Sequence, residues 1–211
     1  NGDVVNTVKG THNKGFNRVA WNLTHANRSG VPLKAPKPNP EEDFFGSPYL
    51  TTPGTYTVTL YKNTDGILTE LSPAKSFEVK PLKKGALPAK PSAEIDSFRD
   101  SFQKFQQDLK ATITSISKAK KQLKAMQRAY KEAKRPSNEL YAKITKAKSE
   151  LLAIATIMKG NSAKNEVGEK NVPSPQDGAF VGFVALNNTY GPTGNHLKAF
   201  SRAQNQLKKL K

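Results

Sequence analysis

The sequence predicts an α+β protein made of two separate parts, an N-terminal antiparallel β-sandwich and a C-terminal antiparallel helical coiled-coil hairpin or bundle. In residues 1–82, apolar residues alternate with polar ones, which is typical of half-buried strands. In residues 92–211 they recur every three or four positions, which is typical of one face of a helix. Between the two parts, residues 83–91 contain Pro, Gly and Lys and are predicted to be a linker.

Two segments of the N-terminal part carry the clearest strand patterns. In residues 15–23, the large apolar side chains Val19, Trp21 and Leu23 fall on one face of an extended chain. Residues 55–61 are rich in β-branched and aromatic residues, and their apolar side chains alternate with threonines. Both segments are therefore predicted to be half-buried strands.

Turn and loop residues separate the predicted strands. The sequence Asn-Thr-Asp-Gly at 63–66 predicts a hairpin turn, and residues 76–80 form a last alternating segment. Residues 31–40 contain four prolines, which donate no backbone hydrogen bond, so they are predicted to be a loop. Several short strands separated by turns are typical of an antiparallel sandwich.

The helical part begins with one long predicted helix. Ser92 is its expected N-cap, and the helix is expected to continue to Lys134, about 40 residues in all. Pro136 is expected in the first turn of the next helix. The apolar positions of the first helix are Ile95, Phe98, Phe102, Phe105, Leu109, Ile113, Ile116, Leu123, Met126 and Tyr130.

A second helix follows after a short break and is expected to end at Gly160. Its apolar positions are Leu140, Ile144, Ala147, Leu151, Ile154 and Met158. Two apolar seams joined by a short loop predict an antiparallel pair. Residues 176–188 and 195–211 are predicted to be further helices, and the last one is expected to pack on the hairpin as a third long element.

The charge of the chain is strongly positive. It contains 34 Lys or Arg and 17 Asp or Glu, a formal net charge of +17. Between positions 110 and 159 there are 13 basic and three acidic residues, a local excess of ten. This excess favours an anionic partner, although a Lys-rich solvated helix surface is an equally simple interpretation. The candidate polyanion contacts are Lys118, Lys120, Lys121, Lys124, Arg128, Lys131, Lys134 and Arg135.

The sequence contains no motif typical of catalysis or of metal binding. The chain has no Cys, and its three histidines, His12, His25 and His196, are not at metal-binding spacing. The acidic cluster at 41–43 is interpreted as a solvated loop. We find no phosphate-binding or nucleophile motif and no carboxylate pair. We therefore predict no catalytic, cofactor-binding or metal-binding residue, and a protein that is not an enzyme.

The N-terminal motifs resemble a known family. Residues 15–23, GFNRVAWNL, and 52–60, TPGTYTVTL, are similar to the pattern GxNxxxWxL … PGxYxVxL. That pattern marks an Ig-like module, related to one in the flagellar hook-capping protein, near the C-terminus of exported Bacteroidetes-like proteins with BNR/sortilin-type β-propellers. A helical hairpin follows the module in those proteins. They are often labelled glycosyl hydrolases, but this chain has no Asp-box and no propeller repeat.

The resemblance implies structural roles for four residues and a function. It implies that Gly15 permits a bend, that Trp21 fills the core of an Ig-like sandwich with Tyr56 beside it, and that Gly54 holds a turn closed to larger residues. The implied function is a non-catalytic scaffold that docks to a protein partner or to an upstream propeller of the same chain. The implied location is outside the cell, at its surface or in the periplasm.

Two other functions stay open at this point. The basic hairpin favours a polyanion-binding or nucleic-acid-binding protein. The chain is also compatible with part of a glycoside hydrolase whose catalytic domain lies upstream, since it starts at Asn1 and not at Met. The sequence contains no run of 18 apolar residues, so no membrane span is predicted.

Overall fold

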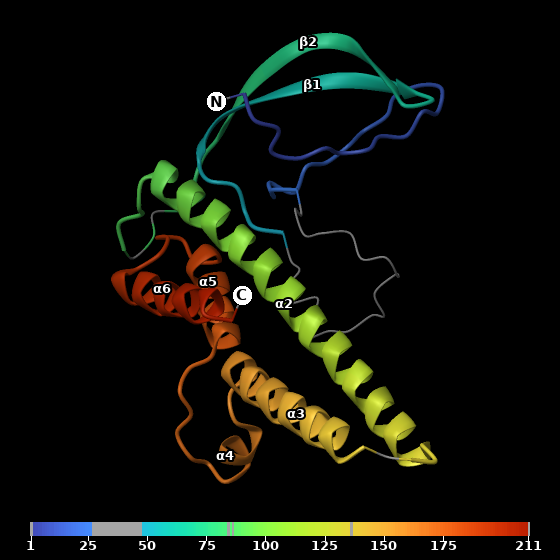
Figure 1. The fold of residues 1–211 in the computed structure, drawn as a ribbon. Helices are drawn as coiled ribbons and strands as arrows, with labels where there is room; N and C mark the ends of the chain where they lie inside the picture. The colour runs from blue at the N-terminus through green and yellow to red at the C-terminus, as the bar shows by residue number, and fades with distance from the viewer. Residues whose placement is uncertain (1, 27–47, 84, 86, 136, 211) are drawn as a thin grey trace.

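The protein is predominantly helical, and its only sheet within the described residues has two strands (Figure 1). A computed structural model describes residues 2–26, 48–83, 85, 87–135 and 137–210. The predicted proline-rich loop at 31–40, the acidic cluster at 41–43 and Pro136 lie outside these residues. The elements are β1 Gly54–Thr64, β2 Ile67–Val79, α2 Ser92–Glu132, α3 Asn138–Lys159, α4 Ser162–Glu166, α5 Pro175–Leu186 and α6 Gly194–Lys208. The predicted combination of an Ig-like sandwich with a coiled coil is therefore wrong.

The two strands form one long antiparallel hairpin, and its predicted turn is confirmed. Asp65 and Gly66 connect the strands with φ angles of 51° and 88°. A two-residue loop with both φ angles positive follows the natural twist of a hairpin, and the side chain of Asn63 accepts a hydrogen bond from the Gly66 N–H at 3.0 Å. A break in the register opposite Thr59 accommodates Pro73, which cannot donate to a ladder.

The segment 15–23 does not form the predicted strand. Val19 is 53 % exposed, and Leu23 has a φ of 58°, which no strand residue adopts. The nearest pairing is a single bridge between Thr24 and Leu50. Alternation of apolar residues is a sufficient pattern for a strand only when a neighbouring strand satisfies its backbone groups, and no described strand does so here. The described part of the chain contains no second sheet, so it forms no sandwich.

Trp21 lies in a small aromatic cluster instead of the centre of a sandwich. Its ring centroid is 5.7 Å from that of Tyr56 and 6.0 Å from that of Phe77, in edge-on arrangements. The expected contact between Trp21 and Tyr56 is thus present, on one side of the hairpin, but Trp21 is only half-buried. Its indole N–H donates to the carbonyl of Thr24 at 2.9 Å.

Gly15 and Gly54, to which the resemblance gives structural roles, have different backbone conformations. Gly15 has a φ of 105°, a conformation that favours glycine, although no strand follows it. Gly54 begins β1 opposite Val79, and its φ is not in the left-handed region. A Cβ at Gly54 would meet only the ring edge of Tyr56, at 3.9 Å, so the expectation that only glycine fits there is wrong.

The long helices begin and end close to where the sequence predicts. Gly160 is the C-cap of α3 with a φ of 81°, as expected. The hydroxyl of Ser137 caps the start of α3 by accepting from the Leu140 N–H. Ser92 is not the N-cap of α2, because that position is Pro91 and the Ser92 hydroxyl faces the carbonyl of Pro53 at 3.4 Å.

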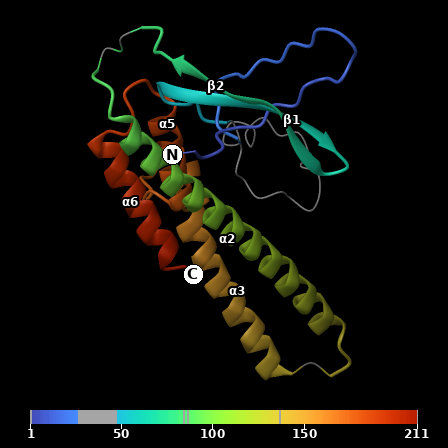
Figure 2. The ribbon, with the colours of Figure 1, turned by 90° about the horizontal axis from the view of Figure 1, so that it is seen from above.

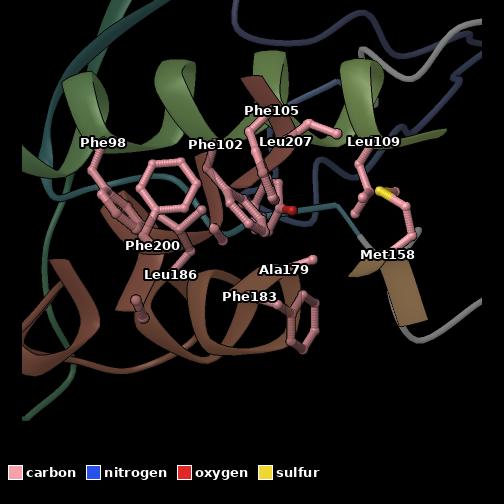
Figure 3. Close-up of a cluster of buried hydrophobic side chains, with 13 residues drawn as sticks. Phe98, Phe102, Phe105, Leu109, Met158, Ala179, Phe183, Leu186, Phe200 and Leu207 are labelled. Carbon is pink, nitrogen blue, oxygen red and sulfur yellow. The ribbon is translucent and has the colours of Figure 1, made fainter. Parts of the chain in front are cut away.

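The hydrophobic core lies between the first half of α2 and the helices α5 and α6, not along a coiled-coil seam (Figure 3). On α2, Phe98, Phe102, Phe105 and Leu109 are all buried, and Phe102 is completely so. Other members of the predicted seam are largely open: Met126 is 55 % exposed and Leu140 49 %. Two helices cannot enclose a seam alone, so α2 is buried only where other helices cross it.

Helices α5 and α6 each begin with a capping box. Ser174 and Asp177 exchange hydrogen bonds at the start of α5, and Thr193 and His196 do so at the start of α6. Phe200 of α6 is 5.1 to 5.7 Å from three phenylalanine rings of α2. The last helix therefore packs on the hairpin, as predicted, through the first half of α2, and it also packs on α5. It has 15 residues against 41 in α2, so it is not a third long element.

Candidate anion-binding surface

The candidate polyanion contacts lie in the last turns of α2 and the loop after it, on the part of the hairpin that extends away from the core (Figures 1 and 2). The first of them are nearest to the core, and Lys120 borders a crevice with Met158. We call residues 118–135 and 137–143 the basic tip; they are the last turns of α2, the described loop and the first turns of α3. All eight basic side chains predicted from the sequence are exposed. Helix α3 folds back beside α2, and the end at which the two helices join lies away from α5 and α6 (Figure 2).

The positive charge of the tip is not neutralised by the described part of the chain. None of the eight side chains makes an ion pair with a described residue. The acidic residues of the tip are Glu132 and Glu139, and Glu139 is 2.6 Å from the ammonium of Lys143. Six of the eight cations lie on α2 and two on the loop after it, and with one unpaired carboxylate among them they create a positive potential that attracts anions in solution.

The helix itself explains part of this composition. Lys and Arg have high helix propensity, and cations near a helix C-terminus interact favourably with the helix dipole. Lys131 in the last turn of α2 is such a residue. The dipole effect fades within one turn, so it does not account for Lys118, Lys120 and Lys121, which lie more than two turns before Glu132.

A second basic face, which was not predicted from the sequence, lies on α6. Lys198, Arg202 and Lys209 follow one stripe of the helix and border a shallow depression of about 630 Å³. A sequence signal was available, since the chain has no Asp or Glu after Asp177. The depression is open and has no buried charged group, so it is a broad surface and not an enclosed pocket.

Tyr49 was also missed, and it joins the N-terminal part to the helical core. Its side chain is 6 % exposed, its ring is 6.1 Å from that of Phe102, and its hydroxyl donates to the Gln106 carboxamide at 2.9 Å. Burial raises the pKa of Tyr49 to about 12, while the hydrogen bond to Gln106 lowers it. Tyr49 follows the residues predicted to be a loop, and no periodicity marks it as a core residue.

The Tyr49 contact predicts a stability change at alkaline pH. A phenol pKa raised above 10 in the folded state stabilises the fold below pH 10, and this contribution is lost as pH rises from 10 to about 12. Two pKa units correspond to about 2–3 kcal/mol. We expect Tyr49→Phe to reduce the loss of stability over this window in urea titrations, whereas Tyr141→Phe at an exposed site should match the parent chain. Equal pH profiles for Tyr49→Phe and the parent would contradict the burial of the phenol.

Metal-binding geometry is not found in the described residues. They contain no group of three or more His, Cys, Asp or Glu placed to hold a metal ion. The crevice between α2 and α3, lined by Ile113, Ala155, Met158 and their neighbours, has a volume of about 30 Å³, room for about one water. No described helix is both long and apolar enough to cross a membrane.

Comparisons with family models, with curated proteins and with solved structures found no match to this chain.

Proposed function

We propose that the chain is a non-catalytic accessory module that docks a larger protein or assembly onto an anionic surface through the basic tip. The observation that carries this function is the set of eight exposed basic side chains with no ion pair among the described residues. They project from a rigid hairpin that is held at its other end by an aromatic core. The charge geometry supports this role without any contribution from the resemblance to propeller-associated regions.

The tip is suited to attraction more than to selective recognition. Six of the eight predicted contacts are Lys, which is a hydrated point charge, whereas bidentate recognition of phosphates and carboxylates relies on Arg. Charges on a convex tip interact with many arrangements of anions. We therefore expect weak binding without sequence choice and with a steep dependence on salt.

The test is the binding of heparin, used as a polyanion probe, at several salt concentrations. We expect the changes Lys120→Gln, Lys121→Gln, Lys124→Gln and Arg128→Gln together to weaken binding at low salt by at least about tenfold and to flatten the salt dependence. Helix content should not change, because Gln is also a good helix former.

The matched control removes the same four charges elsewhere on the surface. Lys9, Lys14, Lys62 and Lys75 are exposed and distant from the tip in sequence. Changing these four to Gln lowers the net charge equally, so it should weaken binding only slightly. Equal losses in the two variants would mean that net charge alone binds the probe. No binding even at low salt would leave the tip as a solvated face and contradict the proposed function.

Docking to a protein through the β-hairpin is the second candidate. Val58, Leu60 and Leu68 on its strands are each more than half exposed, and Ile67 at the turn is 71 % exposed. Val58 and Leu60 are two residues apart on β1 and share one face of the hairpin, and exposed apolar surface of this kind is typical of protein interaction sites. Association through such a surface would persist at high salt, which distinguishes it from binding through the basic tip.

A further inference from the structure

The basic tip also carries exposed apolar side chains. Tyr141 is 57 % exposed, Met126 55 % and Leu140 49 %. The ring of Tyr141 lies against that of Tyr130, with 5.5 Å between centroids, so the two aromatic residues join the ends of α2 and α3. In a longer bundle these positions would be buried. At the end of a two-helix hairpin, they stay in water.

Basic residues flank two of these apolar side chains in the sequence. Met126 lies between Lys124 and Arg128 in α2, and Tyr141 is followed by Lys143 in α3. Lys and Arg beside Leu, Met and Tyr are the composition of protein surfaces that rest in a membrane interface. There, the apolar groups enter the boundary of the acyl chains, and the cations stay at the level of the anionic headgroups.

We infer that the basic tip binds the surface of a bilayer containing anionic lipids, with Leu140 and Tyr141 entering the interface, an inference that rests on the proposed function of the tip. The eight cations supply attraction to the headgroups, and the apolar side chains supply contact that salt does not screen. Tyr suits this depth because its ring is apolar and its hydroxyl can stay hydrated. The hairpin binds at the interface without crossing the membrane.

The geometry favours a bilayer over a single-stranded nucleic acid. Binding of single strands uses a basic groove with several aromatic side chains on which successive bases stack. Of the described residues of the tip, Lys120 borders the small crevice between α2 and α3, and none borders the depression on α6. Tyr141 is the one exposed aromatic residue of the tip, since Tyr130 is half-buried against it. Exposed aliphatic side chains at the end of the hairpin suit the interface of a bilayer better than they suit a nucleic acid.

The test measures the chain on vesicles and on heparin in parallel. Flotation with vesicles of phosphatidylcholine and phosphatidylserine in equal parts should capture the parent chain, and vesicles of phosphatidylcholine alone should not. We expect Leu140→Gln with Tyr141→Gln to weaken capture by about tenfold or more, because two apolar side chains no longer enter the interface. Heparin binding should stay within about twofold of the parent, since no charge changes.

A matched pair of substitutions on the same helix controls for general loss of apolar surface. Leu152 and Ile157 are 63 % and 46 % exposed on α3, away from the tip. Leu152→Gln with Ile157→Gln should leave vesicle capture unchanged. Far-UV circular dichroism should show the parent helix content for both pairs, because all four side chains are exposed.

The remaining outcomes decide which of the two proposals fails. Heparin binding without capture by anionic vesicles would overturn the membrane inference and leave the proposed function intact. If the parent chain bound neither heparin nor anionic vesicles, both the proposed function and the membrane inference would be overturned. Equal losses of vesicle capture in the two pairs would also overturn the inference, because the tip would have no special part. Tight binding of a single-stranded oligonucleotide that Leu140→Gln with Tyr141→Gln abolishes would identify base stacking instead and contradict it.

Discussion

Phe102→Ala is expected to lower the free energy of unfolding of the helical part by about 3–5 kcal/mol. Phe102 is completely buried, and its ring lies within 6.4 Å, centroid to centroid, of the rings of Phe98, Phe105 and Phe200. It also meets Tyr49, which comes from the N-terminal part. Removing the ring leaves a cavity at the point where four segments meet, and the rigid helices cannot all move to fill it. Urea unfolding followed by far-UV circular dichroism measures the effect.

The control for this change is Phe16→Ala. Phe16 is 90 % exposed, and its nearest ring contact is the guanidinium of Arg18 at 6.0 Å. The same atoms are removed, but they are not buried, so we expect a change within about 0.5 kcal/mol. Similar urea midpoints for the two variants would show that the aromatic cluster on α2 is not the core of this protein.

Gly182→Ala is expected to destabilise the protein although it improves the helix propensity of α5. Alanine in place of glycine inside a helix contributes up to about 1 kcal/mol of stability. At Gly182, however, the new Cβ would overlap the ring of Phe102, which is buried and cannot swing away. Overpacking of this kind typically costs about 1–3 kcal/mol. We expect the cost of the overlap to exceed the gain in helix stability, so thermal unfolding should show a lower midpoint.

Gly194→Ala is the opposite case and serves as the control. Gly194 is the first residue of α6, and a Cβ there would meet no atom within 4 Å. The propensity effect acts alone, so the variant should be as stable as the parent chain or slightly more so. If Gly182→Ala behaved like Gly194→Ala, the close approach of α5 to α2 would be refuted.

The helices of this protein follow from local sequence because their signals are local. The repeat of apolar residues in α2 and α3, the glycine at position 160 and the two apolar segments that became α5 and α6 were sufficient to predict helices there. The turn at Asp65 and Gly66 was predicted for the same reason, since its conformation depends on the residues in it. The capping boxes that begin at Ser174 and Thr193 each span four residues, so they are local signals of the same kind.

The sandwich was wrong because a sheet depends on partners that are distant in sequence. Residues 15–23 have the alternation of a strand, but alternation says only which side chains could share a face. Whether another strand lies alongside is decided by the rest of the chain, and the positive φ of Leu23 shows that the backbone turns away. The same dependence on distant partners explains why Trp21 is only half-buried. It packs against Tyr56 and Phe77, and the described residues form no second sheet to cover it.

The sequence alone determined the charge of the candidate site, the eight basic residues that compose it and the helices that carry them. Only the tertiary structure decided which part of α2 is covered. Helices α5 and α6 cross its first half, so Phe102 is buried there, while Met126 on the same predicted seam is exposed at the tip. Periodicity records that a face is apolar, but burial needs a second surface, and its position depends on contacts between residues far apart in the chain.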